Sequence, residues 1–361
     1  MQVDLRSIVI ECSIPKLPSR VEEVASMART IGYNVLDVIV QKRKSVHHST
    51  CIGPGKLVEL KRIVEEKDVK FVIFANTLPS AQVFKIRRQL GGDVKVIDRN
   101  LLILEVFDKR AMTKEAKLQI KLAMLKYTFS WGREFLRLEG ILGEQVGWSG
   151  PGDYPYSEYE REARKRISRL EAELRDLYEK KDLLRGRRHE LGFPIVALAG
   201  YTQSGKTTFF NRITSEEKNV GLGPFTTLST VARCITAPGN NGKKQFILVD
   251  SIGFIEDMHP IILKAFNTTL GEIAQADLIL LFVDVSEDLH FLRRKLASTD
   301  KTLRQTGVTS RIIICANKID LVSQENLKEA LSEIGRHFPG AVISQISALT
   351  GRNAEELLSQ N

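Results

Sequence analysis

The stretch Ile195-Val-Ala-Leu-Ala-Gly200-Tyr-Thr-Gln-Ser-Gly205-Lys-Thr207 decides the fold of the second half of this chain. Its segment Gly200–Thr207 matches GxxxxGK[ST], in which glycines let the backbone curl so that successive N–H groups point at a phosphate. The apolar run Ile195–Ala199 indicates a buried strand, and Thr208–Thr214 indicates the helix that leaves the loop. A strand, this loop and a helix, in that order, predict a phosphate-binding loop in an open α/β sheet.

Two side chains of this loop have the chemistry of phosphate transfer. Lys206 should reach the β- and γ-phosphate oxygens, and the hydroxyl of Thr207 should bind Mg²⁺. The backbone and side chains around them complete the phosphate site. The phosphate-loop candidates are Gly200, Tyr201, Thr202, Gln203, Ser204, Gly205, Lys206, Thr207 and Thr208.

The tetrapeptide Asn317-Lys318-Ile319-Asp320 follows an apolar strand, at the sheet edge where open α/β folds bind ligands. Asp320 can accept hydrogen bonds from both N1–H and the 2-amino group of guanine. Adenine would leave this carboxylate desolvated and unpaired. We expect Asn317 to brace the loop and approach the guanine oxygen, and the stem of Lys318 to cover one face of the base.

A second short segment, Ser347-Ala348-Leu349, lies downstream of this tetrapeptide. We expect it to close the far side of the base through the backbone N–H of Ala348. In this order after a phosphate loop, the two segments predict that GTP is the nucleotide.

Asp250-Ser-Ile-Gly253 ends another apolar strand. Asp250 suits a water-mediated contact to Mg²⁺, and the N–H of Gly253 can bond the γ-phosphate. Upstream, the hydroxyl of Thr227 is expected to complete the Mg²⁺ shell, with Thr226 as the competitor; β-strand propensity is the alternative explanation for this threonine pair. Loss of the γ-phosphate should release both segments.

The expected catalytic groups are Lys206, Thr227 and the backbone of Gly253, and the expected metal ligands are Thr207, Thr227 and Asp250. Gly253 is followed by Phe254, where a water-orienting glutamine often stands. Because phenylalanine cannot hydrogen-bond a water, we predict slow intrinsic GTP hydrolysis that a partner raises.

The first part of the chain shows the same alternation of strand and helix patterns, which predicts a parallel sheet covered on both faces. The expected strands are Ser7–Glu11, Val35–Val40, Phe71–Ala75, Val94–Ile97 and Leu101–Val106. The expected helices are Arg20–Ile31, Lys56–Lys67 and Ser80–Leu90.

Between these α/β regions the strands stop. Thr113–Leu138 and Tyr156–His189 have apolar residues at helical spacing, which predicts an antiparallel helical hairpin. Its glycine-rich loop, 140–153, is either a connector or a functional tip. The predicted organisation is an N-terminal α/β domain at 1–112, a hairpin at 113–191 and a Ras-like P-loop GTPase domain at 192–361.

Composition adds broad constraints. The formal net charge of +9 suits a polyanionic partner such as RNA, although ordinary surface charge is an equal alternative. None of the four cysteines forms a CxxC pair, and Cys234 and Cys315 lie in apolar strand-like runs where cysteine behaves as a small hydrophobe. No apolar run is long enough to span a membrane. We expect a cytoplasmic monomer.

These motifs resemble those of the HflX family of ribosome-associated GTPases. Asp250-Ser-Ile-Gly-Phe-Ile255 is similar to the family's DTVGFI, and Ala265-Phe-Asn-Thr-Thr-Leu270 to its AFxSTL helix. Gly150-Pro-Gly-Asp153, Ile52-Gly-Pro-Gly-Lys-Leu57 and the helix around Lys117–Tyr127 resemble further family elements. Gln203 stands where the family usually carries asparagine.

The resemblance implies binding to the large ribosomal subunit and its rRNA, GTPase stimulation by that subunit, and a role in splitting or rescuing ribosomes. Because the chain ends at Asn361, it resembles the compact form without the extra C-terminal domain, most like archaeal members. The alternative from another class is a GTP-regulated scaffold for a protein partner. Association with rRNA or large subunits would separate the two.

Overall fold

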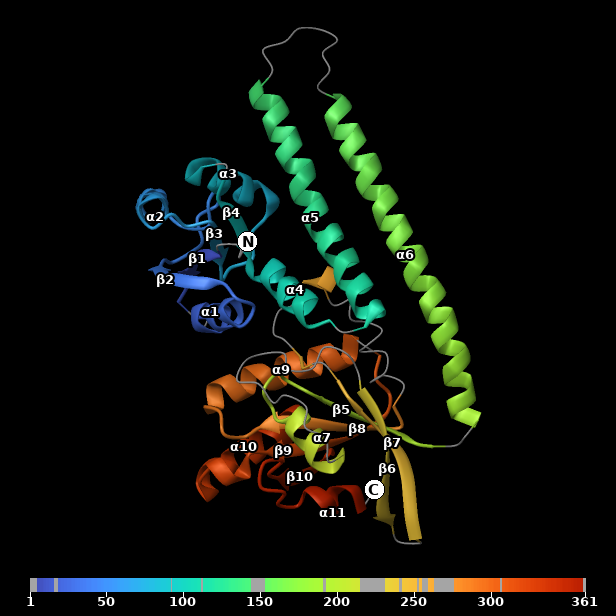
Figure 1. Cartoon of the computed structure of the whole chain (residues 1–361). Coiled ribbons are helices and arrows are strands. Elements are labelled where there is room, and N and C mark those ends of the chain that lie inside the picture. The colour runs from blue at the N-terminus through green and yellow to red at the C-terminus, as the bar shows by residue number, and fades with distance from the viewer. Residues whose placement is uncertain are drawn as a thin grey trace. The chain divides into compact units, whose positions relative to one another are not determined.

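The structure is a computed structural model that describes residues 5–15, 19–91, 93–111, 113–143, 153–190, 193–214, 231–239, 242–251, 253–254, 259–262, 276–305 and 307–359. The chain forms two compact units, shown in Figure 1. The first comprises Met1–Lys109 with Lys117–Asp176, and the second comprises Arg110–Ala116 with Leu177–Asn361.

The first unit contains a four-stranded sheet with the strand order β2-β1-β3-β4, in which every pairing is parallel. Its strands are β1 (Arg6–Ser13), β2 (Asn34–Lys42), β3 (Phe71–Phe74) and β4 (Lys95–Asp98). Parallel neighbours need a crossover between them, which the intervening helices supply. This confirms the predicted parallel α/β sheet.

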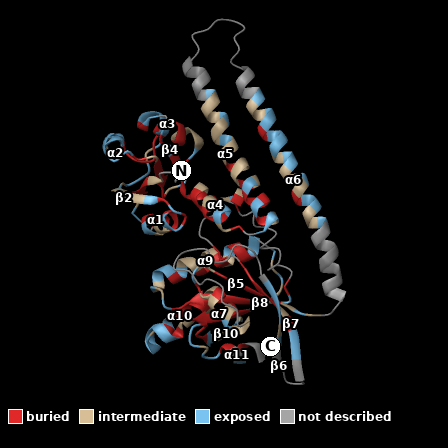
Figure 2. Cartoon of the chain, viewed as in Figure 1, coloured by how far each residue is buried: buried red, intermediate tan, exposed pale blue. Residues whose placement is uncertain are grey.

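Helices cover both faces of this sheet. They are α1 (Val21–Thr30), α2 (Pro54–Glu66), α3 (Ser80–Leu90) and α4 (Arg99–Arg110). Alternate strand residues such as Ile8, Val72 and Phe74 share one buried cluster with apolar residues of α2 and α3. Because successive strand side chains point to opposite faces, Val9 and Ile73 are buried on the other face. Figure 2 shows buried residues, in red, among the strands and helices of this unit.

The prediction of a strand at Leu101–Val106 is wrong, because these residues lie in helix α4. The helix is buried almost all round, so its sequence shows a continuous apolar run that periodicity cannot distinguish from a buried strand. The overlooked signal is Asp98, whose Oδ1 accepts a hydrogen bond from the N–H of Leu101 at 3.0 Å. This is the contact by which an aspartate caps the start of a helix.

The helices α5 (Lys114–Gly143) and α6 (Asp153–Glu190) form the predicted antiparallel hairpin. Lys126 pairs with Glu171 at 2.6 Å, and further along α5 the Phe129 ring stacks on Tyr159 with 6.1 Å between ring centroids. The residue later in α5 thus contacts the residue earlier in α6, as an antiparallel pair requires. The stacking places Tyr159 between the two helices of the hairpin.

The glycine-rich interruption begins later than predicted, because α5 continues through Gly140 and ends at Gly143. A single glycine costs a helix only about 1 kcal/mol relative to alanine, so a long helix tolerates it. The elements Gly150–Gly152 and Trp148 of the predicted tip lie outside the described residues. A second apolar face of α5, which carries Trp131 and Phe135, packs against the core of the first sheet.

The second unit contains a six-stranded sheet with the strand order β10-β9-β8-β5-β7-β6. Its strands are β5 (Ile195–Gly200), β6 (Val231–Gly239), β7 (Gly242–Asp250), β8 (Leu278–Asp284), β9 (Arg311–Asn317) and β10 (Val342–Ile346). All pairings are parallel except that of the edge strand β6 with β7. The parallel strands bring their carboxyl ends to one edge of the sheet.

Among the described residues, the helices of this unit include α7 (Lys206–Thr214), α9 (Leu289–Gln305), α10 (Gln324–His337), α11 (Ala354–Ser359) and a short 3₁₀ helix (Ile319–Leu321). Phe209 and Phe210 of α7 and Leu357 of α11 share a buried cluster with β5, β8 and β9. Cys315 is buried there as predicted, but Cys234 is exposed, because it lies on the edge strand β6. Within the described residues, no helix is long and apolar enough to cross a membrane.

Candidate functional site

The loop Gly200–Thr207 connects β5 to α7, and its conformation requires the glycines of the motif. Gly200 has φ +133°, and a Cβ there would lie 2.3 Å from the carbonyl oxygen of Phe282 on β8. Gly205 has φ +97°, and a Cβ there would lie 2.1 Å from Nδ2 of Asn317. Both positions combine a backbone conformation that favours glycine with a neighbour too close for any side chain. The glycines therefore permit the close packing of the loop.

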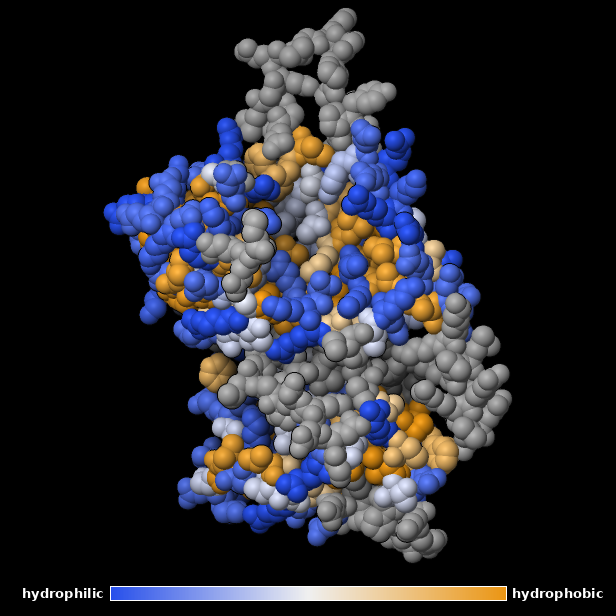
Figure 3. Space-filling view, viewed as in Figure 1, coloured by the Kyte–Doolittle hydropathy of each residue, from blue (hydrophilic) through white to orange (hydrophobic). Residues whose placement is uncertain are grey.

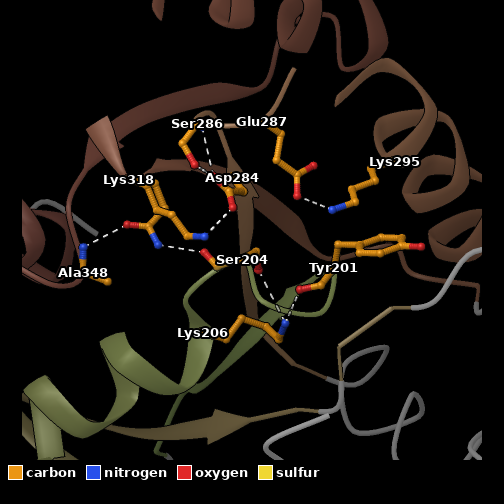
Figure 4. Close-up of polar contacts among 10 residues, drawn as sticks. Tyr201, Ser204, Lys206, Asp284, Ser286, Glu287, Lys295, Lys318 and Ala348 are labelled. Carbon is orange, nitrogen blue, oxygen red and sulfur yellow. Dashed lines mark hydrogen bonds and ion pairs between the residues drawn. The ribbon is translucent and has the colours of Figure 1, made fainter. Parts of the chain in front are cut away.

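Lys206 is buried at the start of α7, and its ammonium group lies along the loop (Figure 4). Its Nζ donates to the carbonyl oxygens of Gly200 at 3.0 Å and Tyr201 at 2.6 Å. Burial lowers the pKa of Lys206 to about 8, the charge of Asp250 acts in the opposite direction, and Lys295 lowers the pKa further. The loop thus holds a desolvated ammonium group whose charge a bound phosphate would favour.

Thr207 and Asp250 lie side by side in the interior of the site. The Thr207 hydroxyl donates to Oδ2 of Asp250 at 3.3 Å, and both residues are buried. A hydroxyl and a carboxylate are hard oxygen ligands of the kind that Mg²⁺ prefers, and phosphate oxygens and waters usually complete its shell. This donor pair fits a magnesium ion that Thr207 ligates directly and Asp250 contacts through water.

Gly253 and Phe254 lie directly against the phosphate loop. A Cβ on Gly253 would be 2.7 Å from Cα of Thr202, so glycine allows this approach. The N–H of Phe254 donates to the Gly200 carbonyl at 2.9 Å, and the Thr202 N–H donates to the Phe254 carbonyl at 3.1 Å. The Phe254 side chain is buried. The segment that should sense the γ-phosphate is therefore hydrogen-bonded to the loop on both sides.

Asn317, at the end of β9, connects the phosphate loop with the predicted base loop. Its Nδ2 donates to the Ser204 carbonyl at 2.7 Å, and its Oδ1 accepts from the Ala348 N–H at 2.8 Å. Asn317 therefore braces both loops. The Ala348 N–H, which we expect to close the far side of the base, donates to Asn317 in this structure.

The other predicted base-site residues surround Asn317. Lys318 has φ +69° and its Nζ pairs with Asp284, while Asp320 is exposed in the 3₁₀ helix. Ser347 is buried and Leu349 is exposed. Thr227 and Thr226, together with Phe225–Leu228 and Ala265–Leu270, lie outside the described residues. The structure thus brings together the phosphate-loop, Asp250–Gly253 and base-loop candidates at one sheet edge.

Comparison with known proteins assigns this arrangement to a family. Successive parts of the chain match the models "GTP-binding GTPase N-terminal" over residues 18–108, "GTP-binding GTPase Middle Region" over 110–188 and "50S ribosome-binding GTPase" over 195–318. GTPase HflX from Thermococcus kodakarensis is 37% identical over 342 residues, which cover 93% of this chain and 75% of that one. The chain belongs to the HflX family. It is a GTP-binding P-loop GTPase.

Another HflX protein, from Thermofilum pendens, is 40% identical over 335 residues, covering 91% of this chain and 77% of that one. Among solved structures, the complex of SsGBP with GDP is similar with a TM-score of 0.54 and 27% identity, covering 98% of this chain and 96% of that one. The likeness to HflX proteins therefore extends over nearly the whole chain, as the sequence motifs implied.

Several polar residues of this HflX site escaped the sequence analysis. Asp284 ends β8, and its Oδ1 accepts from the N–H and hydroxyl of Ser286 at 3.0 and 2.6 Å while Lys318 pairs with its other oxygen. Lys295 of α9 pairs with Glu287, and its Nζ lies 4.7 Å from the centroid of the Tyr201 ring (Figure 4). Asp284 could have been found as a carboxylate at the carboxyl end of an apolar strand. The pairing of Lys295 with Tyr201 has no sequence signal.

Other motifs of the first unit have structural explanations. Gly53-Pro-Gly-Lys56 is the turn that opens α2, with Gly53 at the cap position. Arg164, Arg166 and Arg169 of α6 pair with glutamates of the same helix and are exposed. Among the residues that the structure describes, no cluster of His, Cys, Asp and Glu could hold a metal, and Cys51 beside His47 is buried.

Proposed function

We propose that this HflX-family protein is a Mg²⁺-dependent GTPase switch that acts on the large ribosomal subunit. The observation that carries the proposal is the match of residues 195–318 to the family described as "50S ribosome-binding GTPase". The matches to the N-terminal and middle-region models add the parts that HflX proteins carry besides the GTPase domain. The net charge of +9 is compatible with an rRNA partner.

In the proposed hydrolysis, Lys206 and the backbone N–H groups of residues 200–208 bind the β- and γ-phosphates. Thr207 and Thr227 would hold Mg²⁺ directly, and Asp250 would hold it through water. The ion supplies neutralisation of the charge that develops on the phosphate oxygens. The Gly253 N–H bonds the γ-phosphate, so the segment around it changes its contacts when that phosphate leaves.

Guanine selection is assigned to the loops at the ends of β9 and β10. Asp320 is exposed and accepts the two guanine donors, and Asn317 lies between the phosphate loop and Ala348. Lys318 pairs with Asp284, and this pairing supports the proposal that its stem covers one face of the base. Ser347–Leu349 closes the other side.

Slow intrinsic turnover follows from Phe254. Its side chain is buried and carries no group that orients a water. The hydrogen bonds that join Phe254 to Gly200 and Thr202 also hold this segment against the loop. A partner that reshapes the segment therefore raises turnover, and the large subunit is the partner we propose.

The N-terminal domain and the hairpin would bind the GTPase to the ribosomal subunit. We keep the division into an N-terminal domain, a hairpin and a GTPase domain at 1–112, 113–191 and 192–361, with a monomer in the cytoplasm. Figure 3 shows hydrophilic residues over much of the visible surface of α2, α3 and α6. The hairpin and the N-terminal domain would contact rRNA.

The test is co-sedimentation of the protein with purified large ribosomal subunits, in the presence of a non-hydrolysable GTP analogue or GDP. The proposal predicts more bound protein with the GTP analogue than with GDP, and a loss of binding as salt rises. The matched control is Lys206→Ala, which should not respond to the GTP analogue. Binding that is absent at low salt with either nucleotide would contradict the ribosomal partner and favour a scaffold for another protein.

A further inference from the structure

Arg212 lies on α7, the helix that begins at the phosphate loop, but its side chain contacts a different part of the site. Its Nε donates to the carbonyl oxygen of Ala348 at 3.0 Å, and its Nη2 donates to the carbonyl oxygen of Leu349. One guanidinium therefore holds two consecutive carbonyls of the base loop. Arginine suits this task because its planar fork presents several donors in a fixed geometry.

The base loop is shaped around this side chain. Gly351 has φ +86°, and a Cβ there would lie 2.5 Å from Nη1 and 2.9 Å from Cζ of Arg212. The Gly351 N–H donates to the Ser347 carbonyl at 2.8 Å, which closes the turn. A residue with a side chain at position 351 would displace the guanidinium. The turn and the arginine thus fit each other.

Burial holds Ser347 and Ala348, whereas polar contacts hold the exposed end of the loop at Leu349. Leu349 is 69% exposed, so packing does not hold it. Ala348 is held from two sides, because its N–H donates to Asn317 and its carbonyl accepts from Arg212. Asn317 also donates to Ser204 in the phosphate loop. The loop Ser347–Leu349 is therefore connected to the phosphate loop in two ways. One connection runs through Arg212 and α7, and the other runs through Asn317.

We infer that Arg212 is a positioning residue that holds the base loop closed and so sets how long a guanine nucleotide stays bound. The inference rests on the proposed assignment of Ser347–Leu349 to the base. A loop fixed before binding loses less conformational freedom when the nucleotide arrives. Without Arg212 the loop samples open states, and bound nucleotide escapes faster.

The experiment measures release of GDP from the full-length protein with a fluorescent GDP analogue chased by unlabelled GDP. Arg212→Ala should release GDP about three- to tenfold faster than the natural protein. This is the effect expected when the charge-assisted hydrogen bonds to Ala348 and Leu349 are lost at a partly solvated site. Arg212→Lys, which keeps the charge and one donor group, should restore part of the retention. The matched control is Arg311→Ala, which removes an exposed arginine at the opposite end of β9.

Inosine diphosphate, which lacks the 2-amino group, separates positioning from general damage. Arg212 contacts the carbonyls of Ala348 and Leu349, whereas recognition of the 2-amino group is assigned to Asp320, so Arg212→Ala should speed release of GDP and inosine diphosphate by the same factor. The thermal unfolding midpoint without nucleotide should match that of Arg311→Ala.

Release at the natural rate in Arg212→Ala would overturn the inference, and so would equal acceleration in Arg311→Ala. Asp320→Asn distinguishes a failure of the Arg212 inference from a failure of the proposed guanine site. If that variant loses guanine preference while Arg212→Ala behaves as the natural protein, only the inference fails. If the natural protein shows no preference for GDP over ADP, the assignment of the base loop fails with it.

Discussion

The two units of the molecule both place polar side chains at the carboxyl edge of a parallel sheet, but they use them differently. In the first unit, Asp98 is fully buried and accepts from the N–H groups of Leu78 and Leu101 and from the hydroxyl of Tyr127 at 2.5 Å. Asn100 donates to the same hydroxyl. These groups join strands and helices to one another.

In the second unit, the corresponding edge carries the phosphate loop and the base loop. Asn317 braces both loops, while Asp320 remains exposed. Glycines at 200, 205 and 253 let backbone segments approach one another more closely than side chains would allow. The carboxyl edge of a parallel sheet is therefore not by itself enough to make a ligand site. In the second unit, glycines let the backbone N–H groups of the loops point at a ligand, and polar side chains such as Asn317 hold those loops in place. In the first unit, the polar side chains are buried in the core instead.

The largest expected effect comes from the phosphate loop. Lys206→Ala should lower GTP turnover by about 10²- to 10³-fold, because it removes a preorganised positive charge from the phosphate oxygens. Turnover measured by phosphate release checks this. Lys301→Ala, an exposed lysine of α9, is the charge-matched control and should retain full activity. A residual turnover near the natural rate in Lys206→Ala would place the chemistry elsewhere.

The exposed carboxylate of Asp320, in the 3₁₀ helix after β9, should show the next largest effect. Asp320→Asn should weaken GTP binding by about 100-fold, because the amide no longer accepts both guanine donors. Xanthosine triphosphate, whose 2-oxo group accepts a hydrogen bond, should bind this variant better than GTP does. Equilibrium titration with both nucleotides measures the change. An unchanged preference for GTP would show that the guanine site lies elsewhere.

The buried cluster of the first unit should affect stability rather than nucleotide binding. Tyr127→Phe removes the hydroxyl from Asp98 and should lower the free energy of unfolding by about 2 kcal/mol. Urea denaturation of the full chain, followed by tryptophan fluorescence near Trp131, measures the loss. GDP affinity should stay the same. A weakened GDP affinity at unchanged stability would mean that the polar edge of the first unit also serves the nucleotide.

The smallest expected effect is a pH dependence of nucleotide binding. Burial lowers the pKa of Lys206 to about 8, so the free protein loses this charge as pH rises through 8. A bound phosphate favours the charged form, and GDP affinity should therefore fall about tenfold per pH unit above 8.

The matched comparison for the pH dependence is Lys206→Ala, whose weaker affinity should stay flat over the same range. If the GDP affinity of the natural protein stayed constant from about pH 7 to about pH 9, Lys206 would not lose its charge in the free site, and the prediction would be contradicted. The stability of the nucleotide-free protein should change with pH in the opposite direction. The unfolded lysine keeps its proton up to its ordinary pKa of 10.5, so stability without nucleotide should rise with pH between about 8 and 10.5.

Much of the second unit could be predicted because its chemistry needs fixed residues at fixed spacing. Gly200, Gly205 and Lys206 are determined by the backbone path of the loop, and Asn317 stands at the end of a recognisable strand. Tertiary contacts were less predictable. Arg212 and Lys295 lie in ordinary helices, and their roles depend on carbonyls and a ring distant in sequence. Leu101–Val106 of α4 could not be distinguished from a strand, because burial almost all round the helix removes the periodicity on which the prediction relies.

The ribosomal assignment is decided by GTP turnover of the purified full-length protein with and without large ribosomal subunits. Our account predicts slow turnover by the protein alone, because Phe254 cannot orient a water, and a rise of at least about tenfold with large subunits. Lys206→Ala should abolish the rise, and small subunits should not reproduce it. Turnover that large subunits leave unchanged would contradict the proposed ribosomal switch while leaving the GTPase site intact.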